Sequence, residues 1–189
     1  MQKPKKEIYT LAEYYELEER EEYKSEYYKG EIFAMAGGSR NHSRIQVNLF
    51  RHLSLPKDCE VYSSDLKVWI EQAQHVTYPD ASIVCGEVDF HSGRTDTITN
   101  PVVIFEILSK STEAYDRGKK FDSYRLLPSL REYVLINQHE MHVEHFYKNE
   151  KGQWMFKDYR DQEILNLFSM DSSMAIADFY QNVDFKEKE

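Results

Sequence analysis

The apolar positions of the chain follow helical spacing in some segments and strand spacing in others. Thr10 and Glu13 form a capping-box pair, which predicts a helix that begins near Thr10. The stretch from 11 to 24 has many glutamates and a thin apolar stripe, so we expect this helix to lie solvated on the surface. Helical spacing predicts a second helix over 41–53, and Pro56, three residues later, supports that end.

Strand spacing recurs in eight segments, and two of them flank the tight turn Lys29-Gly30. The segment 101–108 is nearly all apolar, as expected for a strand that is buried on both faces. A polar stretch over 89–100 predicts a loop, and helices are expected over 113–127 and 172–180. The eight predicted strands are 25–28, 31–35, 61–70, 76–85, 101–108, 131–137, 143–148 and 154–159.

This order of elements predicts an α/β fold. We expect a single domain over 1–189, with its core at about 10–160 and a C-terminal helix and charged tail at about 170–189. Hydrophobic residues make up 41% and charged residues 30%, which is typical of a folded soluble protein. No apolar run approaches the roughly 20 residues that a membrane helix needs.

The start of the chain has no apolar core of the kind found in signal peptides, which favours a cytoplasmic location. The chain has two cysteines, Cys59 and Cys85, and we expect both to be reduced. The 33 acids and 24 bases give a net charge of −9, which argues against steering to nucleic acid by the global field. A local basic groove, or one made by a dimer, remains open.

Two acids interrupt apolar strand segments: Asp80 lies in YPDASIVC and Glu106 in VVIFEILS. A buried carboxylate without a partner costs several kcal/mol or shifts its pKa. A divalent cation can neutralise two such groups, and Mg²⁺ prefers carboxylate and carbonyl oxygens. The alternative is that each acid pairs with an Arg or Lys, or lies at a strand end in water.

The predicted helix after Glu106 carries Asp116, Lys120 and Tyr124 on one face. Its first turns can fold back over the strand end, so Lys120 could reach a metal site and stabilise negative charge on a phosphate. The alternative is an exposed Asp–Lys pair worth about 0.3–0.5 kcal/mol.

The run YPDASIV…NPVVIFEILSKST…YDRGKKFDSY…REYVLIN resembles the Uma-type family of putative restriction endonucleases, within the PD-(D/E)XK nuclease superfamily. Three upstream pieces match it too: LAEYYELEE, SEYYKGEIFAMAGGSRNHSRIQVNLFRHL and SSDLKVWI. The likeness covers roughly 10–137. It implies a restriction-endonuclease-like fold, a mixed central sheet flanked by helices, here with an added hairpin and meander.

By position, the resemblance implies that Asp80 and Glu106 are metal ligands and that Ile107 offers its backbone carbonyl to the same Mg²⁺ or Mn²⁺. It places the catalytic lysine at Lys120 and adds Glu26 as a further acid. Asp116 and Tyr124 are expected to support that lysine.

The sequence departs from the superfamily pattern at Leu108, where a lysine normally stands two residues after the second acid. Lys110, Lys119 and Lys67 are therefore rivals of Lys120 for the lysine role. The departure puts full catalytic competence in doubt.

Two sets of histidines offer other sites. His139, His142 and His145 are three residues apart and could bind metal on a helix, but in a predicted hairpin we expect surface histidines. His42 opens the second predicted helix and could approach a phosphate, although capping or packing explains it equally well.

The sequence therefore favours a Mg²⁺- or Mn²⁺-dependent endonuclease that hydrolyses DNA, with a homodimer expected because duplex cleavage usually needs two sites. Two alternatives stay open. One is a nuclease-fold module that binds nucleic acid without cutting it, and the other is a protein-interaction scaffold.

Overall fold

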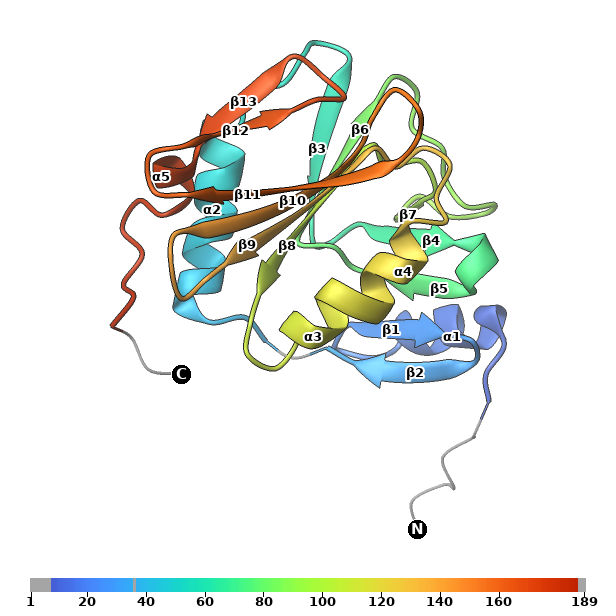
Figure 1. Cartoon of the computed structure of the whole chain (residues 1–189). Coiled ribbons are helices and arrows are strands. Elements are labelled where there is room, and N and C mark those ends of the chain that lie inside the picture. The colour runs from blue at the N-terminus through green and yellow to red at the C-terminus, as the bar shows by residue number, and fades with distance from the viewer. Residues whose placement is uncertain (1–7, 36, 187–189) are drawn as a thin grey trace.

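The computed structural model describes residues 8–35 and 37–186. In it the chain forms two main sheets and passes from one to the other more than once (Figure 1). The six-stranded sheet has the order β11-β10-β9-β8-β6-β3, and the five-stranded sheet has the order β2-β1-β5-β4-β7. A separate two-stranded sheet pairs β12 with β13.

The six-stranded sheet is mixed, as predicted for the central sheet. In it β8 and β9 pair parallel, whereas the pairs β3–β6, β6–β8, β9–β10 and β10–β11 are antiparallel. The bounds are β3 Cys59–Ser63, β6 Ala81–Cys85, β8 Val103–Leu108, β9 Glu132–Asn137, β10 His142–Lys148 and β11 Trp154–Arg160.

The five-stranded sheet contains the hairpin predicted around Lys29 and Gly30. Both residues have positive φ, 49° and 92°, as a tight two-residue turn requires. The bounds are β1 Ser25–Tyr28, β2 Glu31–Ala34, β4 Lys67–Ile70, β5 His75–Thr77 and β7 Thr97–Ile98, with a short 3-10 turn, η1, at Glu71–Ala73.

The first predicted helix is observed as α1 (Leu11–Glu18), with the expected capping box between Thr10 and Glu13. It ends six residues before the predicted end. It is also less solvated than predicted, because Tyr14 is fully buried and Tyr15 is nearly so, both against the five-stranded sheet.

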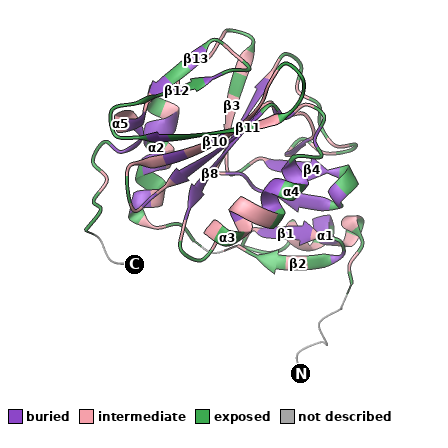
Figure 2. Ribbon diagram, viewed as in Figure 1, coloured by how far each residue is buried: buried purple, intermediate pink, exposed green. Residues whose placement is uncertain are grey.

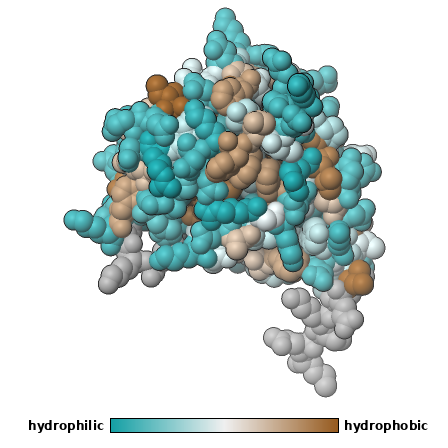
Figure 3. Space-filling view, in the orientation of Figure 1, coloured by the Kyte–Doolittle hydropathy of each residue, from teal (hydrophilic) through white to brown (hydrophobic). Residues whose placement is uncertain are grey.

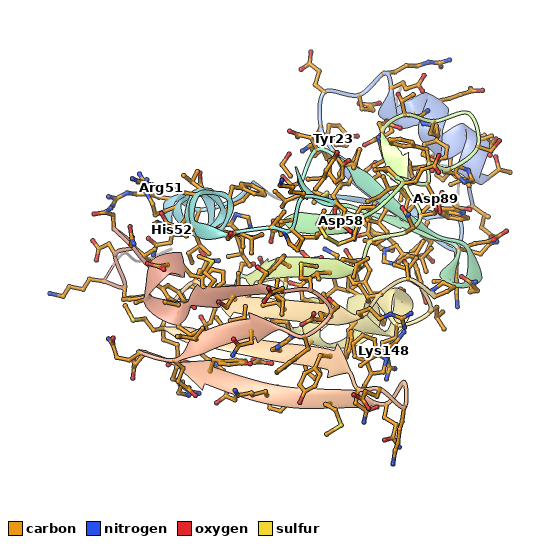
Figure 4. All side chains as sticks on the ribbon, turned by 90° about the horizontal axis from the view of Figure 1, so that it is seen from above. Tyr23, Arg51, His52, Asp58, Asp89 and Lys148 are labelled. Carbon is orange, nitrogen blue, oxygen red and sulfur yellow. A yellow bond between two sulfur atoms is a disulfide. The ribbon has the colours of Figure 1, made fainter. Side chains whose placement is uncertain are left out.

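The core lies on both faces of the six-stranded sheet (Figure 2). On one face pack α2 (Arg40–His52) and α5 (Ile176–Phe179), through Ile45, Leu49 and Phe179. On the other face packs α4 (Phe121–Tyr124). Seen from above, the end of α2, marked by Arg51 and His52, lies on the opposite side of the molecule from Lys148 (Figure 4).

The C-terminal segment holds α2 by hydrogen bonds. The Asn48 amide donates to the carbonyls of Phe179 at 2.9 Å and Gln181 at 2.8 Å, and Asn41 exchanges two hydrogen bonds with the Asp184 backbone. The predicted helix over 172–180 is in fact a strand, β13 (Ser172–Ala175), followed by the single turn of α5; β12 (Ile164–Leu167) was not predicted.

Two long predicted strands are each divided between the sheets. The segment 61–70 is split into β3 and β4 by a turn after Ser63, and the segment 76–85 is split into β5 and β6. The two halves of each segment belong to different sheets, and the spacing of their apolar residues alone does not reveal the change of sheet.

The expectation of reduced cysteines was wrong, since Cys59 and Cys85 form a disulfide. The two residues are direct partners in the antiparallel register of β3 and β6, with their Cα atoms 3.9 Å apart. The pairing of these strands is a tertiary property that the sequence pattern does not show.

The face shown in Figure 3 is mostly hydrophilic, with hydrophobic residues in small groups. Among residues 8–35 and 37–186, no helix has the length and apolar character that crossing a membrane requires.

Candidate active site

Glu106 is the most deeply buried acid of the site, with 3% exposure. It lies on β8, whose six residues are all buried, and alternation puts it on the sheet face that Ile104 and Leu108 share. Leu108 packs in the apolar cluster that contains Phe121 of α4. Position 108, where the superfamily pattern expects a lysine, therefore belongs to the core of this protein.

Asp80 lies just before β6, where the chain arrives from the other sheet. The antiparallel register pairs Ala81 with Phe105, so one further step brings Asp80 opposite Glu106. The backbone N–H of Ile107 donates to Asp80 Oδ2 at 2.6 Å. The prediction that Asp80 lies in the middle of a strand was wrong, because the chain changes sheets at this residue.

His42, in the first turn of α2, contacts the other oxygen of Asp80. Its Nε2 lies 3.0 Å from Asp80 Oδ1. Burial lowers the pKa of His42, but the hydrogen bond and the charge of Asp80 outweigh burial and leave the pKa raised.

Lys120 brings a buried amine to these acids. Its Nζ lies 2.8 Å from Glu106 Oε1, 3.4 Å from Glu26 Oε1 and 3.8 Å from Asp116 Oδ1. The predicted helix over 113–127 is not a regular α-helix: α3 (Glu113–Tyr115) leads into a π-turn, η2 (Asp116–Lys120), and then into α4. Such π-turns occur often at functional sites.

Tyr124 and Tyr133 hold this helical segment against the sheet. The Tyr124 hydroxyl donates to Glu106 Oε1 at 2.9 Å, and the Tyr133 hydroxyl donates to the carbonyl of Asp116 at 3.0 Å. Burial, with the charge of Glu106, raises the pKa of Tyr124 well above its ordinary value. Tyr124 therefore stays neutral and can act as a donor.

Glu26 reaches the site from β1 of the five-stranded sheet. The helical segment of α3 and α4, yellow in Figure 1, lies between the two sheets. The Glu26 carboxylate accepts hydrogen bonds from Thr77 and, at 2.9 Å, from Tyr115. Burial raises the pKa of Glu26, but the charge of Lys120 and the hydrogen bonds from His75 and Thr77 outweigh it and hold the pKa well below its ordinary value.

The site has an excess of negative charge. Three carboxylates, from Glu26, Glu106 and Asp116, lie within 3.8 Å of the Lys120 amine, and Asp80 adds a fourth negative charge that acts on Glu106. Burial raises the pKa of Glu106 well above its ordinary value, the charges of Asp116 and Asp80 add to this effect, and Lys120 opposes it. Burial raises the pKa of Asp116 in the same way.

Lys120 stays an ammonium in this setting. Burial lowers its pKa, but the charges of Glu106 and Glu26 outweigh burial and raise the pKa well above its ordinary value. The arrangement therefore supplies carboxylate oxygens for a cation and one fixed positive charge for an anion.

The rival lysines lie elsewhere. Lys67 is buried, but its amine pairs with Glu18 at 2.9 Å and with Asp96 at 2.6 Å, in a separate cluster. Lys110 and Lys119 are exposed. Lys120 is thus the predicted lysine that the structure brings to the acids.

The spaced histidines differ from the prediction of surface residues. His145 is fully buried, and its Nε2 lies 2.6 Å from Glu132 Oε2. His142 pairs with the exposed Asp158 on the neighbouring strand. Within the described part of the chain, no group of three or more His, Cys, Asp or Glu side chains is arranged to hold a metal ion.

Sequence reasoning gave no role in the site to Thr77 or Tyr115, and it left His42 undecided between phosphate contact, capping and packing. The helical N-terminus at His42 was visible in the sequence, but what it faces depends on tertiary structure. Thr77 and Tyr115 carry no signal in the pattern, because both are ordinary residues for the elements in which they lie.

Comparison with known proteins gives a consistent picture. Residues 11–177 match the Uma2 family, whose description is "Putative restriction endonuclease". Two Synechocystis proteins described as uncharacterized are similar to the chain. For slr1290 the identity is 41% over 177 residues, or 92% of each chain. For sll1609 it is 39% over 154 residues, or 80% of this chain and 87% of the relative.

A crystal structure from Anabaena variabilis, described as a putative nuclease belonging to DUF820, is similar in fold. The TM-score is 0.71 at 20% identity, with 91% of this chain and 97% of that chain covered. This confirms the predicted α/β fold class with its nuclease-like mixed sheet.

Proposed function

The chain belongs to the Uma2 family of putative restriction endonucleases, and from this premise we propose that it is a metal-dependent nuclease that hydrolyses DNA phosphodiester bonds. The observation that carries the proposal is the buried group of carboxylates around Glu106: Lys120 contacts Glu26, Glu106 and Asp116, and Asp80 lies opposite Glu106. Uncompensated buried charge of this kind is expensive, so its presence favours a cationic ligand.

The residues present fit Mg²⁺ or Mn²⁺. Magnesium is usually held by one or two carboxylates together with waters, so it does not need a cluster of three protein side chains. Asp80 and Glu106 offer carboxylate oxygens, and Glu106 Oε2 accepts no hydrogen bond from the described residues. The carbonyl of Ile107 is the third proposed ligand.

A bound divalent ion supplies Lewis-acid polarisation of the phosphoryl oxygen and makes a bound water easier to ionise. The protein's own part is electrostatic and positional. The Lys120 ammonium balances the negative charge that develops on the phosphate. Glu106 is held for metal binding by Tyr124, and Asp116 and Glu26 keep Lys120 protonated.

The test is cleavage of a plasmid and of a short duplex in the presence of Mg²⁺ or Mn²⁺, with wild type and Asp80→Ala. We expect Asp80→Ala to lower the cleavage rate more than about 100-fold. Mutation of a group that only hydrogen-bonds to a metal ligand typically lowers metal affinity or activity 10–100-fold, and Asp80 is proposed as a ligand itself. Asp158→Ala, on the surface of β11, is the matched control and should cleave as wild type does.

Wild type and Asp80→Ala that are equally inert, with unchanged DNA affinity, would defeat the proposal. DNA binding without cutting, with a salt slope of roughly −0.9 per phosphate contacted, would instead identify a nuclease-fold binding module. The same assay with an RNA duplex tests the choice of DNA.

We also propose a homodimer, since two sites are needed to cut both strands in one encounter. Light scattering of the purified chain, alone and with a duplex, measures this directly. A monomer in both conditions would contradict it without affecting the metal site.

A further inference from the structure

The N-terminal turn of α2 contacts the site at Asp80, in the connection from β5 to β6 by which the chain passes from one sheet to the other. Ser39 caps the helix by accepting the N–H of His42, and this fixes the backbone from which the imidazole projects. His42 and Asp80 are both mostly buried, with side-chain exposures of 19% and 15%. The contact is therefore built into the fold rather than made by mobile surface groups.

The other side of the His42 imidazole faces the backbone at Gly38. A Cβ added at Gly38 would lie 3.0 Å from His42 Nδ1, so the glycine gives the ring room to pack closely against the backbone. A carboxylate can only accept, so Nε2 carries the hydrogen of the contact with Asp80.

The next turn of α2 also contacts Asp80. The amide of Gln46 donates to the backbone carbonyl of Asp80 at 2.8 Å. With Ile107 N–H on Oδ2 and His42 on Oδ1, both the backbone and the side chain of Asp80 are fixed. An acid that merely neutralised Lys120 would not need these contacts. The acidic partners of Lys120 are Glu106, Glu26 and Asp116, and Asp80 is not among them.

We propose that His42 is a positioning residue for the metal: its Nε2–H fixes the rotation of the Asp80 carboxylate, so that the remaining lone pairs of that carboxylate are held ready for a divalent ion. This inference rests on the proposed function, because it assigns an orienting partner to the proposed metal ligand. Such partners of metal-binding carboxylates typically contribute 10–100-fold in affinity. The benefit comes from pre-organisation, since the ligand need not be ordered when the ion arrives.

The experiment is calorimetric titration of Mn²⁺ into the full chain at one fixed pH, with wild type, His42→Ala, His42→Gln and Asp80→Ala. The glutamine variant keeps an N–H donor at a reach similar to that of Nε2. His142→Ala is the matched control, because it removes another histidine that pairs with an aspartate, on β10 and outside the site. Thermal unfolding of the metal-free variants checks that each of them folds.

We expect His42→Ala to weaken Mn²⁺ binding about 10–100-fold. We expect His42→Gln to recover most of that loss, and His142→Ala to bind as wild type does. A general loss of structure would lower the melting temperature without rescue by glutamine. Rescue of affinity therefore separates positioning from a merely structural role. If His42→Ala does not fold, His42→Gln is compared with wild type instead. A positioning donor predicts near-wild-type Mn²⁺ affinity in that variant, and a much weaker affinity contradicts the proposal.

Equal or tighter binding by His42→Ala, together with loss in Asp80→Ala, overturns this inference and leaves the proposed function intact. Absence of saturable binding by wild type overturns the proposed metal site, and it is seen before any variant is compared. A glutamine variant as weak as the alanine variant, with both folded, also overturns the positioning role.

Discussion

Two buried lysines of this protein have opposite surroundings, although each is only 5% exposed. Lys67 pairs with Glu18 and Asp96, and Arg94 adds a second cation beside Asp96 at 2.7 Å. Lys120 is instead shared among the carboxylates of the candidate site. With Glu19, which also pairs with Arg94, the first cluster has two cations for three acids, whereas in the second Lys120 is one cation for three.

The pKa values of the acids follow this difference. Hydrogen bonds from Arg94 lead the effects that hold the pKa of Asp96 well below its ordinary value. Burial leads the effects that raise the pKa of Glu106 and Asp116, and the neighbouring acids reinforce it. A buried ion pair by itself is therefore a poor marker of function, whereas a buried acid without enough cations is a useful one.

The largest expected effect comes from removing each lysine. Lys120→Met and Lys67→Met should each lower the free energy of unfolding by about 3–5 kcal/mol, because each leaves buried carboxylates without their partner. Millimolar Mg²⁺ should restore part of the loss in Lys120→Met but not in Lys67→Met, since the proposed metal site lies beside Lys120. Urea unfolding with and without Mg²⁺ measures both effects.

The exposed Lys119→Met is the matched control on the same helical segment and should be close to wild type. Equal responses of the two lysine variants to Mg²⁺ would remove the distinction between the clusters.

The disulfide supports the strand that follows Asp80, and its loss should be the next largest effect. Replacing Cys59 and Cys85 together by Ser should cost about 3 kcal/mol, from the chain entropy of a loop closed over 26 residues. Unfolding in urea measures the loss. Reducing agent should reproduce it in wild type and have no effect on the double variant; a wild type that is insensitive to reduction would contradict the prediction.

The pH dependence of stability should distinguish the acids of the two clusters. The pKa of Glu106 is raised in the folded state, so the folded state holds the proton more tightly. Stability is then greatest below the ordinary pKa of 4.5 and falls as pH rises through the raised pKa. In wild type the free energy of unfolding should therefore decline by up to about 1.4 kcal/mol per pH unit over that range, and Glu106→Gln should remove this decline. Urea unfolding of the metal-free protein across the range measures it.

Asp96→Asn should behave in the opposite sense. The pKa of Asp96 is lowered, so its contribution is present above the ordinary value of 3.8 and is lost as pH falls below it. The difference between Asp96→Asn and wild type should therefore vanish in acid. Parallel pH profiles for the two variants would contradict the comparison.

The smallest expected effect tests the wall of the site that the five-stranded sheet provides. Thr77→Val removes a hydrogen bond to Glu26 without changing the volume much, and it should cost about 1 kcal/mol. It should also raise the pKa of Glu26, because that hydrogen bond favours the ionised form. NMR titration of the Glu26 carboxyl measures the shift, and an unchanged pKa would show that Thr77 does not contribute to it beside Lys120 and His75.

Local chemistry was predictable from the sequence. The capping box at Thr10, the turn at Lys29-Gly30 and the buried strand around Glu106 depend on neighbouring residues only, and all three are observed. Asp80 and Glu106 were named from the apolar segments that they interrupt, Lys120 from its helix face, and Glu26 from the family resemblance. The structure brings them together, although their catalytic roles stay predictions.

What depends on the pairing of distant segments was not predictable. The chain changes sheets at Asp80 inside a continuous apolar pattern, and the disulfide follows from the register of β3 with β6. The sequence likewise could not show that His42 faces Asp80, because that contact needs α2 to be docked on the sheet.

The anchoring of α2 by the C-terminal segment has a consequence for the order of events during translation. Asn41 and Asn48 receive their backbone partners from residues 179–184, which are synthesised after them, at sequence separations of 131 to 143. Until then, the helix that carries His42 lacks those attachments. A nascent or prematurely terminated polypeptide that ends before residue 179 therefore has to hold His42 beside Asp80 without these attachments.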